Sequence, residues 1–107
     1  MFFKSITLFT MIFIISCSMQ KSTNGFDSAC LIFQEASTKN LNPEKLGSYI
    51  SGELDKMDAQ PASEDVKEVY HALFNVDPTE RYGLFKESAE RFLERNWDCS
   101  AMKELYQ

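Results

Sequence analysis

The sequence predicts an all-α fold: a small bundle of about five short helices stapled by one disulfide. No segment alternates apolar and polar residues as a half-buried strand does, whereas several segments repeat apolar residues at helical intervals. Two cysteines, Cys30 and Cys99, lie near the two ends of the part that carries these repeats. We therefore expect residues 27–107 to form one small helical domain.

The first two helices are expected at residues 28–39 and from Pro43 onward. Asp27 or Ser28 can cap the first helix. Asn42 can cap the second, with Pro43 at the first helical position, which its fixed φ suits. The apolar residues of the first helix are Cys30, Leu31, Ile32, Phe33 and Ala36. Those of the second helix, spaced to form one face, are Leu46, Tyr49, Ile50, Leu54 and Met57.

Two further helices follow after a loop. Ser63 is expected to cap the third, and Asp77 the fourth, with Pro78 at its first position. Glu87 and Arg91, four residues apart, form a favourable pair on the polar face of the fourth helix. The third helix is expected to bury Val66, Val69, Tyr70, Leu73 and Phe74. The fourth is expected to bury Tyr82, Phe85, Ala89, Phe92 and Leu93.

The last helix is expected to be short. Asn96 or Trp97 ends the fourth helix, and Asp98 can cap the fifth. The apolar residues of this fifth helix are Cys99, Met102, Leu105 and Tyr106. Because the connections are short, neighbouring helices should pack antiparallel or at steep angles.

Cys30 and Cys99 are expected to form a disulfide, since both fall on apolar helical faces of a chain that carries an export signal, described next. The bridge would close a loop of about 70 residues, which the chain-entropy account equates with about 4 kcal/mol of stability. The alternative is a pair of buried thiols that behave as small apolar residues.

Residues 1–16 are expected to be a signal peptide. Lys4 gives a positive start, and residues 5–15 form an uncharged apolar run of 11 residues. A membrane-spanning helix needs about 20 apolar residues, whereas a run of about 11 suits the apolar region of a secretory signal. The segment is therefore expected to direct export and to take no part in the fold.

The end of this run, Ile14-Ile15-Ser16-Cys17, resembles the lipobox of bacterial lipoproteins. The resemblance implies that the Cys17 thiol receives a diacylglyceryl group and that cleavage before Cys17 makes it the acylated N-terminus. In a Gram-negative host, Ser18 at the next position implies sorting to the outer membrane, facing the periplasm. The alternative is ordinary signal cleavage after Ser18, which would release a soluble protein.

The membrane is thus an expected partner, reached through the lipid on Cys17. Residues 17–26 are expected to be the lipidated N-terminus and a flexible tether, because residues 18–25 are polar and lack periodicity. Loss of Lys4 reduces the 11 basic residues to 10 against 16 acidic ones, a net charge of −6. No basic cluster is present, which argues against nucleic acid as a partner.

No catalytic or metal-binding motif stands out. His71 is the single histidine and falls on the polar side of its helix, without a marked nucleophile or further zinc ligands. The acidic residues lie at helix starts or on polar faces, where solvation and the helix dipole account for them. We therefore expect no enzymatic activity, no cofactor and no metal.

A candidate partner surface is formed by Arg81, Leu84 and Lys86 in the stretch RYGLFK, which mixes aromatic and charged side chains. Phe85 and Trp97 are expected to be core by their periodicity. Together with PEKLGSYI and the closing WDC, this stretch resembles small helical bacterial envelope lipoproteins of unassigned function. The function expected is a lipid-anchored, non-enzymatic interaction module on the periplasmic face of an envelope membrane, with an unidentified protein partner. The alternative is a periplasmic inhibitor or immunity-type protein that blocks a hydrolase or toxin.

Overall fold

The structure, a computed structural model, describes residues 24–106. The expectations for the signal peptide, the lipobox, Cys17 and the cleavage site lie outside the described residues. Within residues 24–106 the chain is helical with no strand, which confirms the predicted all-α class. The elements are α2 (Gly25–Ser37), α3 (Pro43–Asp55), α4 (Ser63–Ala72), the 3₁₀ turns η1 (Leu73–Asn75) and η2 (Pro78–Glu80), α5 (Arg81–Leu93) and α6 (Ser100–Leu105).

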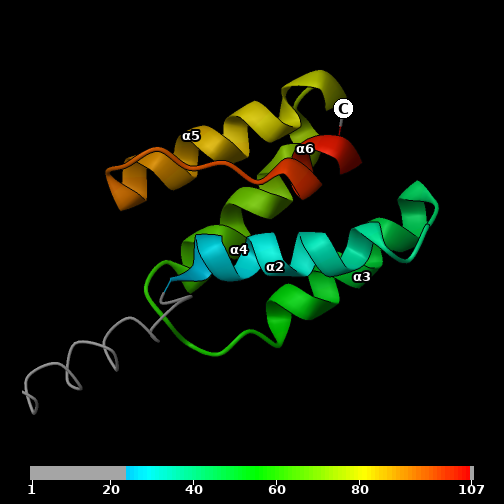
Figure 1. The fold of residues 1–107 in the computed structure, drawn as a ribbon, viewed down its shortest axis with the longest axis horizontal. Coiled ribbons are helices and arrows are strands. Elements are labelled where there is room, and N and C mark those ends of the chain that lie inside the picture. The colour runs from blue at the N-terminus through cyan, green and yellow to red at the C-terminus, as the bar shows by residue number, and fades with distance from the viewer. Residues whose placement is uncertain (1–23, 107) are drawn as a thin grey trace, which may run out of the picture.

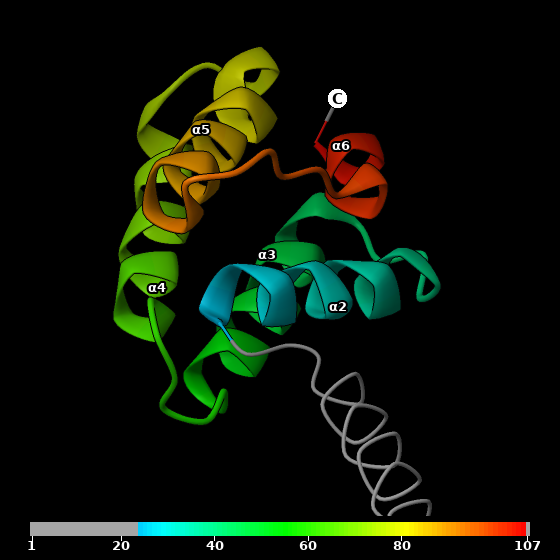
Figure 2. The same ribbon diagram turned by 60° about the vertical axis from the view of Figure 1, so that its left-hand side comes forward.

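Helix α2 is the centre of the arrangement and packs against α3, α4 and α6 (Figure 1). Helix α5 contacts α4 and both 3₁₀ turns. Residues 94–99, which we call the return segment, run back from the end of α5 to α6, as both views show (Figures 1 and 2). The return segment and α6 therefore close the bundle over α2.

The core is rich in aromatic side chains. The rings of Phe26, Phe33 and Trp97 surround that of Phe85, with centroid separations of 5.4, 5.6 and 5.6 Å. The two phenylalanine pairs pack edge to face and the pair with Trp97 is tilted. Such packing adds to the large area that each ring buries, which a domain of this size needs. The other fully buried side chains include Ala29, Ile50, Val66, Tyr70, Leu73, Ala89 and Met102.

Helix α2 begins earlier than the sequence suggested. Its cap is Asn24, whose Oδ1 accepts a hydrogen bond from the Asp27 amide at 2.9 Å, so the prediction of Asp27 or Ser28 as the cap is wrong. Phe26 is 1% exposed, and its burial against the core favours this earlier start. Asn24 and Gly25, which were expected to belong to the tether, are also buried and belong to the folded body.

Of the caps predicted for the next two helices, one is confirmed and the other is wrong. Asn42 caps α3, accepting from the Lys45 amide at 2.8 Å, as predicted. Ser63 does not cap α4, because it is the first helical residue and the capping position is Ala62, with φ of 70°. The Ser63 hydroxyl instead accepts a long hydrogen bond from the Gln60 amide at 3.3 Å, inside the preceding turn.

The ends of α5 also differ from expectation. Asp77 and Pro78 start η2 rather than α5 itself, and the Asp77 side chain makes no capping bond. Helix α5 ends at Leu93 rather than at Asn96 or Trp97, because Glu94 takes the left-handed conformation, with φ of 58°. Cys99, not Asp98, occupies the capping position of α6.

Two aromatic residues expected in the core are exposed. Phe74 and Phe92 are each 45% exposed. Helix α4 ends at Ala72 and tightens into η1, which has about three residues per turn. Val66, Tyr70 and Leu73 form the buried face of this segment, and at the change of pitch Phe74 no longer lies on that face. Phe92 lies in the last turn of α5, with its ring 6.2 Å from that of Phe26.

Candidate binding cleft

A cleft of about 630 Å³ lies where four parts of the chain meet: the start of α3, the 3₁₀ turns, the first residue of α5 and the end of α6. Its lining is mainly apolar. The apolar lining residues are Leu41, Pro43, Leu46, Gly47, Phe74, Pro78, Leu105 and Tyr106. The charged ones are Glu44, Arg81 and Glu104. Clefts of this volume and character are typical of binding sites for small molecules or single side chains.

The exposed ring of Phe74 is held in place by Arg81. The guanidinium carbon of Arg81 lies 4.7 Å from the centroid of the Phe74 ring, within the range of a cation–π contact. The Nε of the same side chain donates a hydrogen bond to the Leu73 carbonyl at 3.0 Å. The Phe74 ring in the cleft therefore lies against a guanidinium group that is itself hydrogen-bonded to the backbone.

Tyr106 lines the cleft, and its hydroxyl is paired with a buried tyrosine. Its hydroxyl lies 2.8 Å from the hydroxyl of Tyr70, which is 1% exposed. Burial raises the pKa of both hydroxyls, and the pKa of Tyr106 is raised further by its hydrogen bond to Tyr70. Both groups are therefore neutral at ordinary pH and can serve as hydrogen-bonding groups, not as a general base.

Two carboxylates lie beside the apolar lining. Glu44, in the first turn of α3, and Glu104, in α6, are both exposed. Neither takes part in any of the ion pairs found among residues 24–106. The cleft thus combines an apolar floor with two negative groups that have no cationic partner in the described part of the chain.

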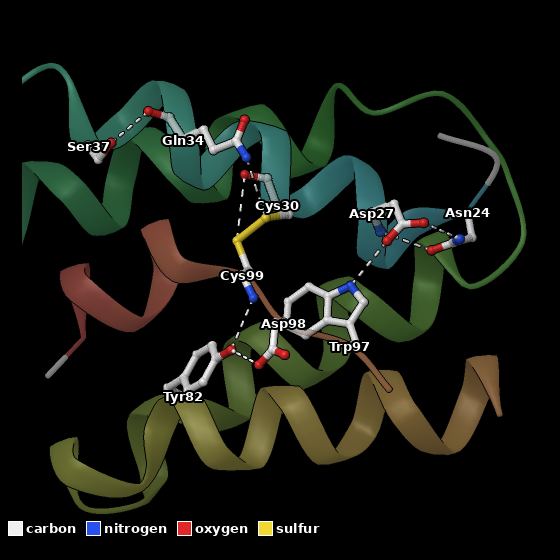
Figure 3. Close-up of a disulfide and its surroundings, with 9 residues drawn as sticks. All are labelled: Asn24, Asp27, Cys30, Gln34, Ser37, Tyr82, Trp97, Asp98 and Cys99. Carbon is white, nitrogen blue, oxygen red and sulfur yellow. Dashed lines mark hydrogen bonds between the residues drawn. A yellow bond between two sulfur atoms is a disulfide. The ribbon is translucent and has the colours of Figure 1, made fainter. Parts of the chain in front are cut away.

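The position of α6, and so of this side of the cleft, depends on the disulfide. Cys30 and Cys99 are bonded, with their Cα atoms 5.8 Å apart, which confirms the predicted bridge. Figure 3 shows the bridge between α2 and the residue before α6. The Cys99 amide also donates to the Tyr82 hydroxyl at 3.0 Å. These bonds hold the start of α6 against both α2 and α5.

The three residues expected to form a partner surface do not gather in one place. Arg81 belongs to the cleft, whereas Leu84 is half-buried beside a separate hollow. Lys86 projects about 140° around α5 from Arg81, at 3.6 residues per turn. Its Nζ donates to Glu90 at 2.6 Å and to the Trp97 carbonyl at 2.7 Å, so this cation is engaged within the protein.

Sequence reasoning missed Phe74, Glu44 and Glu104 as parts of one site. One signal was present, because Asp77-Pro78 lies so soon after Phe74 that the α4 pattern had to break near it. The meeting of α3 with α6 gave no local signal, since it depends on how distant segments pack. His71 is exposed on α4 and is not among the residues that line the cleft.

Residues 24–106 contain no group of three or more His, Cys, Asp or Glu side chains placed to hold a metal ion. In the same part of the chain, no helix combines the length and the apolar character that crossing a membrane requires. Comparison with protein families, curated proteins and solved structures finds no match to this chain.

Proposed function

We propose that this protein is a lipid-anchored, non-enzymatic interaction module on the periplasmic face of a bacterial envelope membrane, and that the cleft is its contact surface. The observation that carries the proposal is the exposed Phe74 ring, which Arg81 holds in place within an apolar cleft. Phe92 is equally exposed, but Phe74 lines a mainly apolar cleft, and an aromatic side chain within such a hollow is the kind of residue that contributes most to binding at protein interfaces.

The geometry of α2 supports this use of the cleft. Its first residue, Gly25, is held to the body by a hydrogen bond from its amide to the Pro61 carbonyl at 2.8 Å. The helix has 13 residues and is therefore about 20 Å long. Leu41, which lines the cleft, comes four residues after Ser37, the last residue of this helix.

This arrangement separates the proposed anchor from the cleft. If Cys17 is acylated, only residues 18–23 connect the anchor to Asn24. A chain of this length spans about 13 Å on average. The start of α2 would then lie next to the bilayer, and the cleft at the other end would face the periplasm. Without Lys4 the chain would carry a net charge of −6, which opposes approach of the body to anionic lipid, so the lipid on Cys17 would supply the attachment.

The anchor is tested by metabolic labelling with a fatty acid analogue in the wild type and in Cys17→Ala. We expect label in the wild type and none in the variant. Equal labelling of both would remove Cys17 as the attachment point. Recovery of the wild type unlabelled and in the soluble fraction would favour cleavage after Ser18.

The contact surface is tested by placing a photocrosslinking amino acid at position 74 or, as a matched control, at position 92. Both side chains are 45% exposed, but only Phe74 lines the cleft. We expect a crosslinked protein partner in intact envelopes from position 74 and none from position 92. An envelope assembly component supports the interaction module, whereas a hydrolase or toxin supports the inhibitor or immunity-type alternative. The absence of any product from position 74 would contradict the use of this cleft.

A further inference from the structure

We propose that the cleft receives a peptide segment in which a large apolar side chain stands next to lysine or arginine. The apolar side chain would lie against Phe74 and Leu46, and the cation would pair with Glu44 or Glu104. This inference rests on the proposed function, because it specifies the chemistry of the partner that the cleft contacts.

The charge of the cleft is the first argument. Glu44 and Glu104 come from different helices and flank the same apolar lining. Both lack an ion-pair partner among residues 24–106, as several other exposed carboxylates do, but these two flank an apolar cleft. The one cation in the lining, Arg81, is directed toward the Phe74 ring and the Leu73 carbonyl. The cleft is thus complementary to a positively charged segment.

The position of Glu104 does not stabilise its own helix. It lies in the last turn of α6, where the helix dipole disfavours a negative side chain. Glu44 differs, since it lies in the first turn of α3, where the dipole favours it. A carboxylate that is exposed, unpaired in the described part of the chain and unfavourably placed in its helix fits a role in binding a cation.

The same charges argue against two other occupants. A second copy of this chain would bring Glu44 and Glu104 toward an identical pair and would carry the same net charge of −6 after loss of Lys4, so the two copies would repel each other. An anionic lipid head group would likewise meet two carboxylates beside the apolar lining. A cationic peptide segment meets neither obstacle.

The test uses the full chain in detergent micelles as the target of a random peptide library. We expect enriched peptides to combine an aromatic or aliphatic residue with adjacent lysine or arginine. One such peptide, capped at both ends, is then titrated against the wild type and three variants. Phe74→Ser should weaken binding by about tenfold or more, because it removes the central aromatic contact. Glu44→Gln combined with Glu104→Gln should weaken it about threefold to tenfold, an effect that high salt removes.

Phe92→Ser is the matched control, since Phe92 has the same 45% exposure and lies outside this cleft, and it should leave binding unchanged. A melting curve for each variant separates loss of binding from loss of folding. The inference is overturned by failure of the library to enrich any peptide, by enrichment of acidic peptides, or by binding that Phe74→Ser does not affect. If the protein dimerises and Phe74→Ser abolishes the dimer, the cleft receives a second copy of this chain instead of a peptide, and the inference is overturned. A partner crosslinked at position 74 that binds without lysine or arginine would overturn this inference and leave the proposed function intact.

Discussion

The indole Nε1 of Trp97 donates a hydrogen bond to the carboxylate of Asp27 at 3.2 Å, between residues that are 70 positions apart in the sequence. The same carboxylate accepts from Arg95 at 2.9 Å and from the Asn24 side chain at 3.0 Å (Figure 3 shows Asn24, Asp27 and Trp97). One side chain thus joins the return segment to the first turn of α2. The disulfide makes the second connection between these parts, one turn further along α2.

We predict that Asp27→Ala lowers the free energy of unfolding by about 1–3 kcal/mol. The change leaves the indole N–H of Trp97, a residue that is 3% exposed, without its acceptor, and an unsatisfied buried donor has this order of cost. Urea unfolding followed by far-ultraviolet circular dichroism, a signal that does not depend on Trp97, measures the loss.

Asp55→Ala is the matched control, because Asp55 is exposed at the end of α3, and it should change stability by less than about 0.5 kcal/mol. In a Trp97→Phe background, Asp27→Ala should cost less than in the wild type. Equal costs in the two backgrounds would show that the Asp27–Trp97 bond does not contribute.

The disulfide should supply a large part of the net stability. Its two cysteines are 69 positions apart, and the chain-entropy account gives about 4 kcal/mol for closing such a loop. We predict that Cys30→Ser combined with Cys99→Ser, or treatment of the wild type with a reductant, lowers the melting temperature markedly. The reductant should have no further effect on the double variant. If reduction left the wild-type melting curve unchanged, the bridge would not stabilise the fold.

At Gly25, the first residue of α2, the backbone lies very close to the backbone at the start of α4. A Cβ at this position would lie 2.9 Å from the Ser63 Cα and 3.0 Å from the Ala62 carbonyl oxygen. Because backbone atoms cannot move aside cheaply, we predict that Gly25→Ala destabilises the protein by about 1–3 kcal/mol. Gly52→Ala in α3 is the control, since a Cβ there meets nothing within 4 Å.

Gly52→Ala should stabilise the protein by about 0.5–1 kcal/mol, because alanine is the better helix former. The two substitutions are chemically identical and are expected to have opposite signs, as urea unfolding of both variants would measure. A stabilising Gly25→Ala would show that the contact between α2 and the turn before α4 is looser than described.

The helices themselves could be predicted from the sequence, because their apolar residues recur at intervals set by helix geometry. The stripe of Leu46, Ile50 and Leu54 is buried as the spacing indicated, and Asn42 caps its helix. The cysteine pairing was also predictable, since two cysteines on apolar helical faces of a domain that is expected to be exported favour a bridge.

The cleft could not be predicted in this way. Phe74 lies in the 3₁₀ turn that follows α4, and the apolar spacing of the sequence predicted a continued α-helical face there instead. The presence of Glu104 and Glu44 in one cleft depends on the packing of α6, for which the sequence has no local pattern. The role of Asp27 was missed for a related reason: it was interpreted as a cap, whereas its partners lie 68 and 70 positions away.

Glu90 links α5 to the return segment through two hydrogen bonds. Its Oε2 accepts from Lys86 at 2.6 Å and from the Trp97 amide at 3.0 Å. Both bonds favour the charged carboxylate and lower the pKa of Glu90, the bond from Lys86 more strongly. Lys86 responds in the opposite direction, and its pKa is raised chiefly by the bond to Glu90.

The signs of these shifts define a pH dependence. Since the folded pKa of Glu90 is below its unfolded value of about 4.3, the stabilisation is complete above that pH and is lost as the pH falls through the folded pKa. We predict that wild type exceeds Glu90→Gln in stability at pH 7 and that the difference shrinks on acidification below about pH 4.3. Urea unfolding at a series of pH values measures this difference.

Glu87→Gln provides the control, because Glu87 pairs only with the exposed Arg91 on the same helix and has no bond to the return segment. The free energy of unfolding of Glu87→Gln should vary with pH as that of the wild type does, over the same pH range. The raised pKa of Lys86 predicts a matching loss on the alkaline side, where stability supplied by the charged ammonium disappears as the pH rises through the folded pKa. A gap between wild type and Glu90→Gln that stayed constant down to low pH would contradict a charged Glu90 as the group that holds the return segment to α5.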